Sequence, residues 1–232
     1  MHDTNNNGIT EQPSVLASHR ALLPKRRLHL FEALRLAELQ ANRLLELSGV
    51  RDIPVPIEVV TDLPRVHIDY EVDMPASGAS DWDSHSKTWV ITLNALEPDT
   101  RQRLSVLHEY KHIIDHGSAG LVAARSDRTY YGLSQEEFLA EYFAGCVLMP
   151  KRILKRAWGD GIQRVSDLAE LFDVSERAMQ VRLGQIGLLT ATDGYERPRS
   201  PLTQRYVRAP RRYHRSFSPN WPTSRLPQGA AA

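Results

Sequence analysis

The stretch that decides the fold is Arg101-Gln-Arg-Leu-Ser-Val-Leu-His-Glu-Tyr-Lys-His-Ile-Ile-Asp-His-Gly117, which carries the pattern His-Glu-x-x-His on a segment with helical spacing of apolar residues. At about 100° per residue, His112 lies about 40° around such a helix from His108, and Glu109 lies about 60° further on. Two imidazoles one turn apart can bind one divalent metal ion while the nearby carboxylate activates a water molecule. The pattern therefore predicts a zinc-hydrolase helix with Glu109 as general base.

A catalytic zinc ion needs a third protein ligand and one open position, so a further donor is expected downstream. Residues 134–149 are apolar on nearly every face, as in a buried helix, and their acidic exceptions are Glu136, Glu137 and Glu141. Glu136 suits the positive N-terminal end of a helix. Glu137 and Glu141 lie one turn apart, and a buried carboxylate is costly unless it binds a metal or is paired. One of these two is expected to bind the metal, and the other to accept a hydrogen bond from a ligand histidine.

Together these segments resemble the ImmA/IrrE metallopeptidases. That family has a helix with His-Glu-x-x-His and then a helix of the form Glu-x-x-Ala-x-x-Phe-Ala that ends in Leu-Met-Pro, as in Glu137-Phe-Leu-Ala-Glu-Tyr-Phe-Ala-Gly-Cys-Val-Leu-Met-Pro150. The resemblance extends upstream to Ile53-Pro-Val-Pro-Ile-Glu58 and downstream to Val165-Ser-Asp-Leu-Ala-Glu-Leu-Phe-Asp-Val-Ser-Glu-Arg-Ala-Met179, and so covers about residues 30–190.

The resemblance implies a role for each site residue. His108, His112 and Glu137 would bind one Zn²⁺ per chain, with Mn²⁺ as an alternative, Glu109 would be the catalytic acid and base, and Glu141 would orient a ligand. This chain departs from the family at Tyr110-Lys111, where a small or apolar pair is common, and at Glu141, where Asn is more frequent. Neither departure removes a ligand.

His116 is an alternative third ligand, because it lies one turn beyond His112. However, it precedes Gly117, which is typical of a helix C-terminus, and the helix dipole favours a histidine there without any metal. The extended zincin motif would also need Gly at Asp115 and His at Ser118. We therefore favour Glu137.

Upstream of the motif, the sequence predicts one helix and a small sheet. Residues 25–48 have the apolar spacing of a helix that ends at Gly49, and residues 57–60 suit the start of a short helix or a strand. Residues 66–70 and 88–93 have the apolar pattern of strands.

The segment between the two predicted strands, residues 75–87, is rich in Ser, Gly and Asp and is predicted to be a loop. Zincin substrates usually lie extended along an edge strand. Thr88–Asn94 is the candidate for that strand, with Trp89 and Ile91 as its substrate contacts.

Four regions follow from these patterns. We predict a disordered N-terminus (1–24), a zincin-like metallopeptidase domain (25–150), a helical subdomain with helix-turn-helix spacing (151–194) and an Arg- and Pro-rich disordered tail (195–232). The tail has eight arginines and one acid and so carries +7, whereas the net charge of the whole chain is +1. It suits weak contact with nucleic acid or an acidic partner.

The sequence thus predicts an α+β zincin-like fold, with a small, largely antiparallel sheet, followed by a helix-turn-helix-like subdomain. The expected activity is zinc-dependent cleavage of peptide bonds, and the family resemblance implies a helix-turn-helix repressor as the substrate. The alternative is a non-catalytic DNA- or repressor-binding regulator with a vestigial or structural metal site. A single cysteine, Cys146, excludes an intrachain disulfide, and the absence of a long apolar run indicates a cytoplasmic protein with no membrane span.

Overall fold

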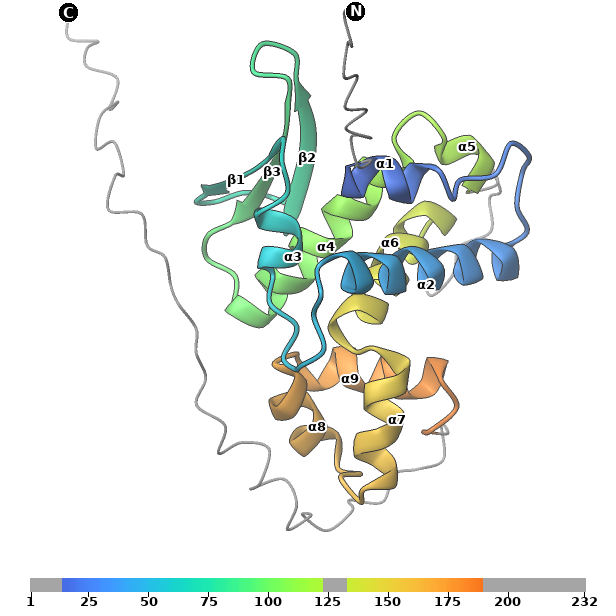
Figure 1. Ribbon diagram of the computed structural model, residues 1–232. Helices are drawn as coiled ribbons and strands as arrows, with labels where there is room; N and C mark the ends of the chain where they lie inside the picture. The colour runs from blue at the N-terminus through green and yellow to red at the C-terminus, as the bar shows by residue number, and fades with distance from the viewer. Residues whose placement is uncertain (1–13, 123–132, 190–232) are drawn as a thin grey trace, which may run out of the picture.

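Two packed helices, α4 (Asp99–Asp115) and α6 (Gln135–Leu148), lie at the centre of the computed structural model, which describes residues 14–122 and 133–189 (Figure 1). The fold is α+β. The elements before α4 are α1 (Val15–Arg20), α2 (Leu30–Leu47), α3 (Glu58–Thr61), β1 (Val66–Glu71), β2 (Gly78–Asp83) and β3 (Thr88–Asn94). Those after it are α5 (Ala119–Val122), α7 (Lys151–Gly159), α8 (Val165–Phe172) and α9 (Glu176–Gln185).

The sheet has three strands in the order β1-β3-β2. β3 pairs in parallel with β1 and antiparallel with β2, so the sheet is mixed and the expectation of a largely antiparallel sheet is wrong. Side chains alternate along β3, which buries Trp89, Ile91 and Leu93 on one face of the sheet. This face joins the core residues of α4, such as Val106 and Tyr110, so the sheet and the motif helix share one apolar layer.

The apolar character of α6 follows from its position between α2 and α4, both of which pack extensively against it. Phe143, Ala144 and Val147 have no exposed surface, and Cys146 is buried as predicted. α2 shows the opposite pattern, because only one stripe of it is buried. Burial on both sides fixes α6 against α4, which is the packing that brings the acidic first turn of α6 to the histidines.

The predicted helical subdomain is present as α7, α8 and α9. α8 ends at Asp173 in the left-handed conformation (φ 53°), and α9 begins where the Ser175 side chain accepts a hydrogen bond from the Ala178 N–H. Buried residues of this subdomain, including Leu168 and Leu183, belong to the same core cluster as those of α2, α4 and α6. The core is therefore continuous across residue 150.

Two expectations about segments without regular structure are wrong. Residues 75–87 are not only a loop, because Gly78–Asp83 forms β2 by pairing with β3. Disorder over 1–24 is wrong from residue 14 onward, because α1 packs on α2 and α4 and its His19 is fully buried. Residues 1–13 and the predicted tail lie outside the described residues.

Candidate metal centre

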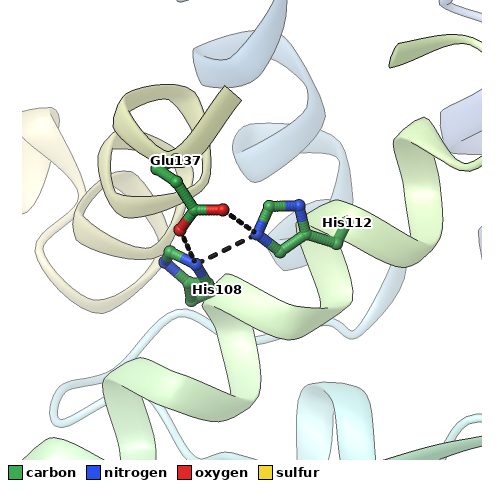
Figure 2. A group of neighbouring side chains, drawn as sticks. All are labelled: His108, His112 and Glu137. Carbon is green, nitrogen blue, oxygen red and sulfur yellow. Dashed lines mark hydrogen bonds and ion pairs between the residues drawn. The ribbon is translucent and has the colours of Figure 1, made fainter. Parts of the chain in front are cut away.

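Three potential metal ligands meet where α4 faces the start of α6 (Figure 2). His108 Nε2 lies 3.0 Å from His112 Nε2 and 3.1 Å from Glu137 Oε2, and His112 Nε2 lies 3.4 Å from Glu137 Oε1. All three side chains are partly buried. In the two stretches that the structure describes, this is the one group of histidine, cysteine or acidic side chains with atoms close enough to share an ion.

The three donor groups lie close enough together to share one metal ion. Ligands at about 2.05 Å from a zinc ion lie about 3.3 Å from one another at the corners of a tetrahedron. The distance between the two imidazole nitrogens, 3.0 Å, is close to this value, and each nitrogen lies 3.1 to 3.4 Å from a different oxygen of the Glu137 carboxylate. With one donor atom taken from each residue, the three atoms lie within 4.8 Å of one another. Two imidazole nitrogens and one carboxylate oxygen are also donors that zinc prefers, and three protein donors leave a fourth position open.

The backbone of α6 brings Glu137 to this group. Ser134 is the N-cap of α6, and its hydroxyl accepts a hydrogen bond from the Glu137 N–H at 3.2 Å. Contact with His108 is the main cause that lowers the pKa of the Glu137 carboxyl, with further contributions from the charges of both histidines. The carboxylate is therefore held in the ionised form that binds metal.

Glu109 lies on the same helix but outside the three-donor group. Its side chain is 8% exposed, and the Ser80 hydroxyl of β2 donates a hydrogen bond to its Oε2 at 2.9 Å. A Cβ built on Gly78, also in β2, would lie 3.1 Å from Glu109 Cγ and 3.3 Å from Oε1. β2 therefore holds this carboxylate by a hydrogen bond at Ser80 and leaves room for it at Gly78.

The prediction that Glu141 is a buried carboxylate that orients a ligand is not supported, because Glu141 is exposed and lines a separate cavity with Leu104 and α9. Glu136, for which we predicted only a favourable interaction with the N-terminal end of the helix, is the carboxylate that lies beside a ligand histidine. Its Oε1 is 3.7 Å from His112 Nδ1, on the far side of the ring from the metal group. A carboxylate there can orient the imidazole. Helical spacing alone could not show which of the two lies near His112, because Glu136 directly precedes Glu137 and Glu141 follows it by about one turn.

The predicted substrate strand also needs correction. β3 is the middle strand of the sheet and not an edge, and Trp89 and Ile91 are 7% and 0% exposed. Both side chains belong to the core. β2 is an edge strand, and through Ser80 it is the strand beside Glu109.

The rival ligand His116 lies outside the three-donor group. It caps the C-terminus of α4, and its ring meets Trp89 edge to face, with the ring centroids 4.9 Å apart. Gly117, which follows it, has φ 81°, as expected for the residue after a helix.

A helix with His-Glu-x-x-His and a glutamate from the next helix, set in an α+β fold, defines the zincin-like class of metallopeptidase fold. The family model described as the IrrE N-terminal-like domain of the M78 peptidases matches residues 69–184, and the chain belongs to this family. The match covers β2, the motif helix, α6 and the helical subdomain up to α9. The family is one of metal-dependent peptidases, in agreement with the donor group.

Among solved structures, the chain is similar to a transcriptional regulator from Mycobacterium tuberculosis, with 16% identity and a TM-score of 0.52. The match covers 80% of this chain but only 55% of the regulator, so the chain spans about half of that protein. At this identity the likeness concerns the fold alone. No curated protein matches the chain. Within the described part of the chain, every helix is too short or too polar to cross a membrane.

Proposed function

We propose that this protein is a zinc-dependent endopeptidase. The observation that carries the proposal is the convergence of His108, His112 and Glu137, whose donor atoms lie within 4.8 Å of one another, with Glu109 next to them on α4 but not among them. A purely structural zinc site takes four protein ligands and has no need of a general base. Three donors, one open position and a separate carboxylate are the parts that metal-assisted hydrolysis requires.

Each residue of the site then has a distinct role. When bound, zinc would polarise a peptide carbonyl and make a water molecule more acidic. Glu109 accepts a proton from the attacking water and later donates it to the leaving amine. Ser80 donates to Glu109 Oε2 and so fixes the carboxylate while its other oxygen is left for the proton. Glu136 places a carboxylate on the Nδ1 side of His112, away from the metal group.

The free edge of β2 is our candidate for the substrate-binding strand. Among residues 14–122 and 133–189, β2 pairs only with β3, so its other edge can pair with an extended peptide. The strand crosses the site at Ser80, beside Glu109, where a peptide on that edge would bring its carbonyl to the metal. This assignment replaces Thr88–Asn94, whose two neighbours in the sheet exclude such pairing.

For the substrate, we propose a helix-turn-helix repressor whose cleavage would release genes of a mobile element, a toxin–antitoxin pair or a stress response. This part of the proposal rests on the family resemblance, and the membership of the chain in the M78 family supports it. A weaker contact of the arginine-rich tail with nucleic acid or an acidic partner remains a proposal based on its charge.

The test is to incubate the purified protein with helix-turn-helix proteins encoded beside its gene, with zinc, with a chelator, and with zinc restored after chelation. We expect defined fragments with zinc, none with chelator, and their return when zinc is restored. The Glu109→Gln variant is the control for a contaminating protease. Binding of a repressor without cleavage, equal in both proteins, would instead support a regulator whose metal site is structural or vestigial.

A further inference from the structure

A cavity of about 180 Å³ lies beside the metal-binding group and has no role in the proposed chemistry. Its walls come from β2, β3, the end of α4 and the start of α6. His112 lines the cavity and is also a member of the donor group, so the cavity begins at the metal centre. Ser80, the partner of Glu109, also lines it. Any group that fills this cavity would therefore lie next to the reacting bond.

Asp115 lines the cavity and carries an unsatisfied acceptor. The residue is 5% exposed, and its Oδ2 accepts a hydrogen bond from the buried ammonium group of Lys111, one turn earlier on α4. Its Oδ1 is also buried but has no hydrogen-bond partner among the residues that the structure describes. Buried polar atoms without partners are rare and costly, so a donor that reaches this atom would be favoured.

Glu136 adds a second carboxylate to the lining of the cavity. Trp89, which is packed edge to face with His116, supplies an apolar wall. The cavity therefore combines an apolar surface for an alkyl chain with acceptors for a cation.

We propose that this cavity is a specificity subsite that binds a basic side chain, lysine or arginine, of the peptide substrate next to the scissile bond. The inference rests on the proposed peptidase function. The volume of 180 Å³ corresponds to about six water molecules at ~30 Å³ each, which is enough for one long side chain but not for a folded segment. The alkyl part lies against Trp89, and the cationic group donates to Asp115 Oδ1 and Glu136.

The test compares pairs of hydroxamate inhibitors that share a zinc-binding group and differ only in a lysine or a norleucine side chain. Two series carry that side chain before or after the zinc-binding group, so that either direction of binding is sampled. Dissociation constants are measured by calorimetry on the zinc-loaded full chain. In one series, we expect the lysine compound to bind at least about tenfold more tightly than its norleucine partner, as for a hydrogen bond to a charged group.

Two variants should remove this preference. Glu136→Gln removes one charge, and the double variant Lys111→Met with Asp115→Leu replaces the buried ion pair by apolar side chains of similar volume, a change that proteins often tolerate. In both, the ratio of the two dissociation constants should fall toward one. Glu141→Gln is the matched control, because Glu141 lies on the same helix but lines the other cavity, and its ratio should stay as in the wild type.

The outcomes separate this inference from the function on which it rests. Equal binding of lysine and norleucine compounds in both series would contradict the subsite but leave the metal centre intact. A preference that persists in Glu136→Gln and in the double variant would also contradict it. Failure of every hydroxamate to bind the zinc-loaded protein would contradict the metal centre itself, and the subsite with it.

Discussion

Glu109 is the residue on which the proposed chemistry depends most closely, and β2 fixes its position. The Ser80 hydroxyl donates to Oε2, and the missing side chain of Gly78 leaves space for the rest of the carboxylate. Neither residue belongs to the donor group. Their contribution to hydrolysis should therefore be separable from metal binding.

We predict that Ser80→Ala lowers kcat about tenfold for a cleaved peptide while zinc content and KM change little, because one hydrogen bond that positions the base is lost. Ser80→Thr keeps the hydroxyl and should recover most of the rate. Steady-state kinetics with metal analysis of each variant provides the check. Equal loss in Ser80→Ala and Ser80→Thr would show that the position matters for packing and not for the hydrogen bond.

At the scale of elements, α6 joins the metal site to the stability of the fold. Its N-cap bond runs from the Glu137 N–H to Ser134, so the same residue is both capped and a metal ligand. Loss of the cap should loosen the first turn of the helix, which is the turn that presents Glu137 to the histidines.

We predict that Ser134→Ala lowers the free energy of unfolding by about 1 kcal/mol, the usual cost of a lost N-cap, and weakens zinc binding. Ser134→Asp keeps a capping oxygen and should retain both properties. Ser175→Ala, which removes the equivalent N-cap of α9, is the control for stability alone. A comparable loss of zinc affinity in Ser175→Ala would contradict the specific link between the α6 cap and the metal site.

α1 gives the fold a dependence on pH. His19 is fully buried between α2 and α4, where its ring nitrogens meet the Tyr110 hydroxyl and the Gln40 carbonyl. Burial, the largest cause, lowers the pKa of His19 from 6.5 to about 4. The neutral ring is therefore the form that the folded protein accepts.

Because the pKa of His19 is lowered in the folded protein, the free energy of unfolding should fall as the pH falls. The contribution of neutral His19 to the free energy of unfolding is complete above about pH 6.5. It is lost as the pH falls toward 4, because His19 takes up a proton in the unfolded chain before it does so in the folded protein. We predict a loss of up to about 3 kcal/mol across this range. In denaturant titrations, His19→Leu should be less stable than the wild type at pH 7, but its free energy of unfolding should change less between pH 6.5 and pH 4. Parallel pH curves for the two proteins would show that His19 does not titrate on unfolding.

The sequence predicts those parts of the fold that local pattern determines. The motif helix and the helical subdomain have helical spacing of apolar residues, α6 has the continuous apolar character of a buried helix, and all lie where expected. β2 has no such signal, because Gly78-Ala-Ser-Asp-Trp-Asp83 becomes a strand only by pairing with β3. α1 is likewise held by tertiary contacts of His19 and Arg20, which a short polar sequence does not reveal.

The site shows the same division. The histidines and Glu109 are fixed by their spacing on one helix, and Glu137 by the form of the next helix. The roles of Glu136 and Ser80 depend on contacts between separate elements. Glu136 of α6 lies near His112 of α4, and Ser80 of β2 donates a hydrogen bond to Glu109 of α4. No spacing within one segment carries that information.

In the molecule as a whole, the main core cluster extends from α2 through α6 into the helical subdomain. Arg182 of α9 is 1% exposed and donates to the Met149 carbonyl at the end of α6, which ties the last helix to the metal-bearing one. The subdomain is therefore part of the folded unit that supports the site. By contrast, the tail after residue 194 lies outside the described residues, and its sequence lacks core-forming periodicity.

We predict that deletion of residues 195–232 leaves zinc content and melting temperature nearly unchanged. The +7 charge of this segment can still speed the encounter with an acidic substrate or with a repressor on DNA, an effect that salt screens. Cleavage by the truncated protein should thus be slower than wild type at low ionic strength and equal to it at high ionic strength. Loss of zinc or unfolding on truncation would show that the tail packs as part of the domain.

The most direct test of the account is to measure zinc content and peptide hydrolysis on the same preparations of wild type, Glu109→Gln and Glu137→Ala. We expect about one zinc ion per chain in wild type and Glu109→Gln, and little in Glu137→Ala. Hydrolysis by Glu109→Gln should fall by at least about 10²-fold despite its full metal content, as for loss of a general acid and base. Near-normal cleavage by zinc-loaded Glu109→Gln would contradict the proposed mechanism outright.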